Sequence, residues 1–166
     1  MRYAVIIISG IVLASSCNLT KHEDAIQLSN ELVQVNDSLN HFGKVWGDEF
    51  KVAVNTRDFT HLQEFRQNIQ YYISERSLHI RAMKDVGDSG PLRQSMLDIL
   101  KFEDEVILPK MKTFERFDAT TPDDTIKFAF QDMMYTTKED LAKHDVMYKL
   151  LDEYAEKNDF PKPLDK

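Results

Sequence analysis

Four charged or titratable residues occupy positions on the apolar faces of the predicted helices: Arg76, His79, Glu103 and His144. Arg76 and Glu103 lie at similar distances on either side of the turn at residues 87–91. If the segments flanking this turn run antiparallel, the two side chains meet inside the fold. There an Arg–Glu pair satisfies both charges and fixes the register of the helices. We therefore predict a structural ion pair between Arg76 and Glu103, ahead of surface exposure or use in ligand binding.

The histidines are the other candidates for chemistry. By the same counting, His79 and His144 lie in neighbouring layers of the interior, where two imidazoles and Asp98 could bind a metal ion. No spacing in the sequence requires such a metal site. A diiron or dimanganese bundle needs two Glu-x-x-His motifs, and none of the five histidines follows a Glu by three positions. We therefore predict no metal and no cofactor, with His79 and His144 as the candidate ligands if a metal is bound.

Motifs for nucleophilic catalysis, covalent haem attachment and phosphate binding are missing. The chain has one cysteine, which rules out an internal disulfide and a CxxC pair. No G-x-S-x-G motif occurs, and Gly90-Pro91 indicates a turn instead of a phosphate-binding loop. We therefore predict that the protein is not an enzyme.

The charge pattern argues against nucleic acid and anionic lipid surfaces as partners. The formal net charge is −7, and positive and negative residues alternate without a basic block. Phosphate contacts need clustered Lys and Arg. Attachment to a membrane must therefore come from another feature of the chain.

That feature lies at the start of the chain. Arg2 precedes an apolar run of about 12 residues, shorter than the roughly 20 that span a bilayer and typical of a secretory signal. The run ends in Leu13-Ala14-Ser15-Ser16-Cys17, which resembles the lipobox of bacterial lipoproteins, with Ala14 where that motif usually has Leu. The resemblance implies cleavage before Cys17, a diacylglyceryl group on its thiol and acylation of the new amino terminus. An ordinary cleaved signal and an uncleaved anchor helix are the alternatives.

Residues 84–93 and 97–102 resemble segments of small helical surface lipoproteins of bacteria whose function is unassigned. This resemblance implies no catalytic residue. Together the two resemblances imply a cell-envelope protein held in the membrane by acyl chains such as palmitate on Cys17. Asn18, where some lipoproteins retained at the inner membrane have Asp, favours the outer membrane.

Apolar residues recur at helical spacing over four long segments, at about 23–55, 58–86, 91–117 and 122–157. Short turns join them, so the fold class predicted is all-α, an antiparallel up-down-up-down four-helix bundle. The first stripe comprises Leu28, Leu32, Val35, Leu39, Phe42, Trp46, Phe50 and Ala53.

Local signals add detail to these helices. Gly43 and Gly47, beside Trp46, suggest close packing of a neighbouring element. Asp58 is expected to cap the second helix and Thr121 the fourth, and Pro109 is expected to kink the third.

The organisation predicted is a signal peptide at 1–16, a lipidated cysteine and tether at 17–22, the bundle at 23–157 and an extended tail at 158–166. The function predicted is a lipid-anchored envelope protein with a binding or structural role and a protein partner at the envelope. The alternative is a periplasmic bundle that binds a metal or cofactor through core His and Glu residues.

Replacement of Cys17 tests the anchor. Because Cys17→Ala removes the thiol that carries the lipid, the variant should move from the detergent phase to the aqueous phase in detergent partitioning. Ser16→Ala keeps a small residue before the cysteine and should partition like the unaltered protein. Retention of Cys17→Ala in the detergent phase would contradict the prediction.

Overall fold

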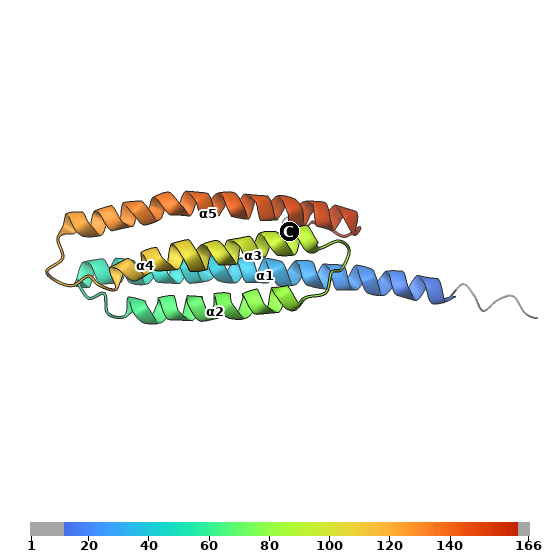
Figure 1. Ribbon diagram of the computed structural model, residues 1–166, viewed down its shortest axis with the longest axis horizontal. Coiled ribbons are helices and arrows are strands. Elements are labelled where there is room, and N and C mark those ends of the chain that lie inside the picture. Colours follow the sequence, from blue (N-terminus) through green and yellow to red (C-terminus); the bar gives the residue numbers. More distant parts are fainter. Residues whose placement is uncertain (1–11, 163–166) are drawn as a thin grey trace, which may run out of the picture.

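The computed structural model describes residues 12–162, and in that range it contains helices and turns without strands. In chain order the elements are α1 (Val12–Thr56), α2 (Leu62–Ala82), α3 (Gly90–Phe102), the π-helical turn η1 (Glu103–Ile107), α4 (Leu108–Phe114) and α5 (Asp123–Lys157). α3, η1 and α4 follow one another as a single rod, and Figure 1 shows the chain reversing direction from each rod to the next. The predicted all-α four-helix bundle is confirmed.

α1 begins earlier than expected. It includes residues 17–22, which we expected to be a tether, as part of one 45-residue helix. Most of the predicted signal peptide and the side chain of Cys17 lie outside what the structure describes. Within the described part, no helix is both long and apolar enough to cross a membrane.

The core follows the predicted stripe of α1. Seven of its eight residues are buried, and Phe42 is half-buried against Tyr72 of α2. At one end of the bundle the stripe forms an aromatic cluster, in which Trp46, Phe50 and Phe114 lie 4.7–5.7 Å apart between ring centroids. Burial of this stripe against the other three rods is the main source of stability for the bundle.

The two predicted helix caps are wrong. α2 begins at Leu62, after Asp58 has bonded locally: its Oδ1 accepts from the Thr60 amide at 3.0 Å and from the Thr60 hydroxyl at 2.6 Å. Thr121, the predicted cap of α5, instead accepts from the Asp118 amide at 3.0 Å, and Asp118 bonds Thr120 as Asp58 bonds Thr60. α5 then begins at Asp123, after an extended Pro122 and without a side-chain cap. An Asp followed two residues later by Thr closes a turn on itself and so leaves no carboxylate for the helix end.

The third rod remains helical through Pro109, where a kink was predicted. The amide of Leu108 donates to the carbonyl of Glu103, five residues earlier, and so closes the π turn directly before the proline. Pro109 has no N–H and its ring crowds the carbonyl four residues back, and the wider turn accommodates both. In Figure 1 the rod continues through this point.

The predicted extended tail begins as a folded turn. Phe160 packs edge-on against Tyr154 with centroids 5.9 Å apart, and Asn158 Nδ2 donates to the Gly87 carbonyl at 3.2 Å. Gly87 has φ +56°, and a Cβ on it would lie 2.0 Å from the Asn158 side chain, so this position favours glycine. Residues 163–166 lie outside the described part.

The predicted Arg76–Glu103 pair is also wrong. Arg76 lies over the Tyr72 ring, 5.4 Å from its centroid, whereas Glu103 faces α5. The arginine that points to the third rod is Arg66, whose Nε and Nη2 donate to the two carboxylate oxygens of Glu115. Arg66 and Arg76 are ten residues apart, which turns them by about 80° around the helix axis.

Loss of the Arg66 side chain should destabilise the bundle strongly. Arg66 and Glu115 are both nearly buried, so Arg66→Ala leaves a carboxylate without its partner and should lower the free energy of unfolding by roughly 3–5 kcal/mol. The double variant Arg66→Met/Glu115→Leu should recover most of this loss. Urea unfolding followed by circular dichroism measures both.

The matched control is Arg57→Ala. Arg57 pairs with Asp123, whose side chain is 81% exposed, and exposed pairs contribute at most about 1 kcal/mol. Equal losses in Arg57→Ala and Arg66→Ala would show that burial does not set the strength of these pairs.

Candidate functional site

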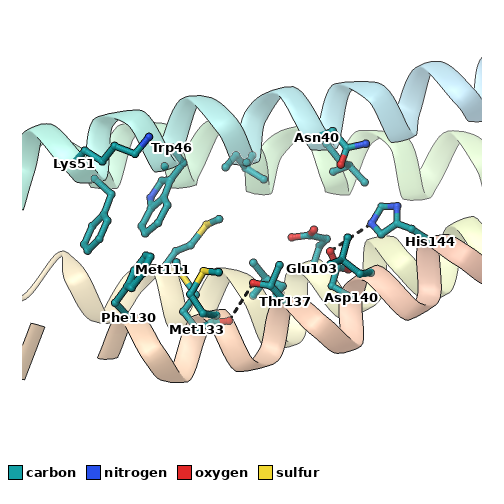
Figure 2. Close-up of a pocket in the computed structure, with 18 residues that line it drawn as sticks. Asn40, Trp46, Lys51, Glu103, Met111, Phe130, Met133, Thr137, Asp140 and His144 are labelled. Carbon is teal, nitrogen blue, oxygen red and sulfur yellow. Dashed lines mark hydrogen bonds and ion pairs between the residues drawn. The ribbon is translucent and has the colours of Figure 1, made fainter. Parts of the chain in front are cut away.

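A cavity of about 430 Å³ lies between α1 and α5, with η1 and α4 contributing its inner wall. Its volume falls in the range of about 300–1,000 Å³ that is typical of small-molecule sites. Figure 2 shows Lys51 and Phe130 at one end and His144 at the other. The lining is mainly apolar, and its larger side chains include Trp46, Phe50, Met111, Phe130, Met133 and Met134.

Two glycines create much of this space. Gly43 and Gly47 lie one turn apart on α1, and a Cβ added to either would meet nothing within 4 Å. The prediction that another element packs closely on them is therefore wrong. They line an opening in the bundle where larger side chains would otherwise fill the gap between α1 and α5.

The end of the cavity opposite His144 offers flat rings and flexible side chains. Phe50 stacks between Trp46 and Phe130, with ring centroids 5.4 and 5.3 Å away. Met111 and Met133 lie beside them (Figure 2), and the polarisable thioether of methionine adapts to ligands of different shape. This part of the cavity suits an apolar molecule.

The inner end of the cavity is polar. Asp140 and His144 are four residues apart on α5 and so share one face of the helix, with 3.4 Å between Asp140 Oδ2 and His144 Nε2. Glu103 reaches the same point from the π turn, and Figure 2 shows its carboxyl group beside Asp140. One donor atom from each of the three residues lies within 4.8 Å of the other two.

A hydrogen bond fixes the histidine ring. His144 Nδ1 lies 2.5 Å from Asn36 Oδ1, and Asn36 Nδ2 donates to the Tyr148 hydroxyl at 2.7 Å. An amide oxygen can only accept, so Nδ1 carries the proton. Nε2 is then the nitrogen presented to Asp140.

Among the described residues, neither carboxyl group of the cluster has a Lys or Arg partner. Burial, followed by the charge of Asp140 and a hydrogen bond to it, raises the pKa of Glu103 to about 8. Asp140 Oδ1 is buried without a hydrogen-bond partner, and among the described residues the ion-pair partner of Asp140 is His144. A proton or a cation at this cluster would therefore offset the negative charge of its two carboxyl groups.

The structure separates the residues that the sequence singled out. Glu103 and His144 belong to the cluster, whereas Arg76 lies over the Tyr72 ring of α2. His79 is half-exposed and pairs with Glu31 of α1, and Asp98 is exposed on α3. The prediction that His79 and His144 occupy neighbouring interior layers is wrong, because His79 points out of the bundle.

Asp140 was missed by the sequence analysis. The signal that could have found it is the spacing Asp140-x-x-x-His144, which places a carboxylate and an imidazole on one face of a helix. The Glu-x-x-His motif of diiron bundles has a three-residue spacing and does not include this pair.

Neither protein-family models, nor curated proteins, nor solved structures give a match to this chain. The fold and the site therefore define its class: a four-helix bundle with a ligand-sized apolar cavity that ends in a Glu–Asp–His cluster.

The Glu103 carboxyl group should make stability depend on pH. Unfolded Glu releases its proton near pH 4.5, while folded Glu103 keeps it up to about pH 8. Between these values the folded state binds more protons, so the free energy of unfolding should fall by roughly a few kcal/mol as pH rises. Glu103→Gln, which carries no titrating group, should lack this fall.

Urea unfolding in the presence of a chelator, at pH 5.5 and pH 8.5, measures the effect. The control is Glu105→Gln, also in η1, because Glu105 is exposed and pairs loosely with Lys101. Its pH dependence should equal that of the unaltered protein. An identical fall in Glu103→Gln would contradict the assignment.

Proposed function

We propose that this protein is a lipid-anchored binding protein of the bacterial cell envelope. Its ligand is a small apolar molecule with a hydrogen-bonding head, held in the cavity between α1 and α5. The observation that carries the proposal is that cavity, whose apolar body and polar inner end match such a ligand. Binding is favoured over catalysis because the site offers no activated nucleophile.

The energetics support a bound molecule. Phe130, Met134 and Leu141 of α5 line the cavity with 37%, 48% and 59% of their surface exposed. A ligand that covers them removes apolar area from water, at about 25 cal/mol for each Å². A bundle with only a structural role gains nothing from this opening, because lining atoms without neighbours lose dispersion contacts.

The orientation of the proposed ligand follows from the different chemistry of the two ends of the cavity. Glu103, Asp140 and His144 supply hydrogen-bonding groups at the inner end, and the stacked rings of Phe50 and Phe130 lie toward the other end. The head group therefore sits at the cluster, and the apolar body lies along Trp46.

The proposed anchor places this cavity at the membrane. The lipobox-like motif ends at Cys17, and α1 leads from there to the cavity wall at Gly43 and Gly47. The body is acidic, so membrane attachment depends on the acyl chains. More than one chain gives stable anchoring. With Asn18 after the cysteine, the outer membrane is the favoured location, and a protein partner there is the expected source or recipient of the ligand.

Trp46 is the only tryptophan, and it lines the cavity, so its fluorescence reports occupancy. Titration with the neutral apolar fluorophore N-phenyl-1-naphthylamine should give saturable energy transfer from Trp46. Gly47→Leu fills the cavity and should weaken this binding at least tenfold. The free energy of unfolding should not decrease, since replacing a glycine inside a helix stabilises it by about 1 kcal/mol.

Gly47→Ala is the matched control. It reduces the backbone entropy of the unfolded chain in the same way as Gly47→Leu but adds a single methyl group. It should therefore keep most of the binding. Absence of saturable transfer in the unaltered protein, or equal affinities for Gly47→Leu and Gly47→Ala, would contradict a ligand in this cavity.

A further inference from the structure

The donor atoms at the inner end of the cavity have the spacing of metal ligands. Two ligands of a tetrahedral Zn²⁺, each about 2.0–2.1 Å from the ion, lie about 3.3 Å apart. His144 Nε2 and Asp140 Oδ2 are 3.4 Å apart as the structure stands. The Glu103 carboxyl group lies within 4.8 Å of both and brings a third candidate ligand to the same point.

An independent observation is the unsatisfied side chain of Asp140. Its Oδ1 has no hydrogen-bond partner although the residue is 8% exposed. A buried carboxylate oxygen without a partner costs several kcal/mol unless a proton, a basic side chain or a cation compensates it. Within residues 12–162 no Lys or Arg pairs with Asp140 or Glu103. A bound cation could therefore supply the positive charge that these side chains do not receive from a Lys or Arg.

The surroundings of His144 orient it as a metal ligand. Metal-binding histidines generally donate their other ring N–H to an oxygen atom, which fixes the tautomer and the ring plane. Asn36 accepts from His144 Nδ1, and Tyr148 in turn fixes the Asn36 amide. Nε2 is thus the ring nitrogen that faces Asp140 and that would bind a metal ion.

We propose that Glu103, Asp140 and His144 bind one divalent transition-metal ion of the Zn²⁺ type at the inner end of the cavity. Two carboxylates neutralise a dication, and the imidazole selects a first-row transition metal over Mg²⁺ or Ca²⁺, which prefer oxygen ligands alone. Three protein ligands leave a coordination position open toward the cavity. The metal site does not depend on the apolar ligand proposed above.

Metal binding can be measured on the full chain after removal of metal with a chelator. Titration with Zn²⁺ by isothermal calorimetry should show one site, and Co²⁺ should give visible absorption bands of a low-coordinate site. Mg²⁺ and Ca²⁺ at the same concentrations should give no heat at this site. Asp140→Asn keeps the shape of the side chain and should weaken Zn²⁺ binding at least tenfold, as should His144→Gln.

Two matched controls should leave this site intact. His79→Gln removes a half-exposed imidazole outside the cluster, and Cys17→Ala removes the one thiol in the chain. Circular dichroism of each variant shows whether it is folded, and Asp140→Asn, being isosteric, keeps the test decisive if His144→Gln unfolds. Zn²⁺ affinity unchanged in Asp140→Asn, or lost in His79→Gln or Cys17→Ala, would overturn the proposal, as would the absence of a stoichiometric site.

The two proposals fail separately. Gly47→Leu should lose the fluorophore but keep Zn²⁺, because Gly47 is not a metal ligand. Asp140→Asn should lose Zn²⁺ but keep the fluorophore, because that probe is neutral and contacts the apolar part of the cavity. A protein that binds Zn²⁺ and not the fluorophore would retain the metal site and overturn only the apolar ligand.

Discussion

Two carboxyl groups without a Lys or Arg partner among the described residues, the half-buried Glu103 and the buried Asp140, set the most demanding condition in this structure. The same bundle handles another buried carboxylate in the ordinary way, since Arg66 places its guanidinium across Glu115 and links α2 to the end of α4. Among the residues that the structure describes, the basic neighbour of the cluster is His144, whose Nδ1 proton is donated to Asn36. This contrast between the two sites is the basis on which we propose a cation at the cluster.

The irregular features of the bundle converge on this point. The π turn that precedes Pro109 begins at Glu103, and its closing hydrogen bond is made to the carbonyl of that residue. π turns insert one residue into a helix and are frequent at functional sites. In this protein the turn keeps the third rod continuous, and it carries the one acidic side chain of that rod that reaches the cavity.

The cavity and the cluster form one compartment with two kinds of wall. Gly43 and Gly47 open it, Trp46 and Phe50 supply flat apolar surface, and His144 ends it with a polar group. An apolar compartment raises the strength of every electrostatic contact inside it, since fewer water molecules screen the charges. A metal ion and an apolar ligand would therefore reinforce one another when the ligand's head supplies a donor atom for the open coordination position.

The sequence by itself determined the four helical segments and most of the core of α1. Both follow from spacing along one chain: apolar residues from Leu28 to Ala53 recur every three or four positions, and only a helix brings them to one face. It also determined that Glu103 and His144 point inward, since each stands on such a stripe. The cysteine motif remains a prediction from sequence.

Only the tertiary structure decided which inward residues meet. Arg76 was matched to Glu103 by height along the helices, but height says nothing of rotation about each axis, and the arginine facing the third rod is Arg66. The space beside Gly43 and Gly47 was likewise read as close packing, because absence of a side chain gives no information about what fills the gap. Asp140 joins Glu103 and His144 through the packing of α5 against η1, and contacts between segments so far apart in sequence depend on the three-dimensional arrangement of whole helices.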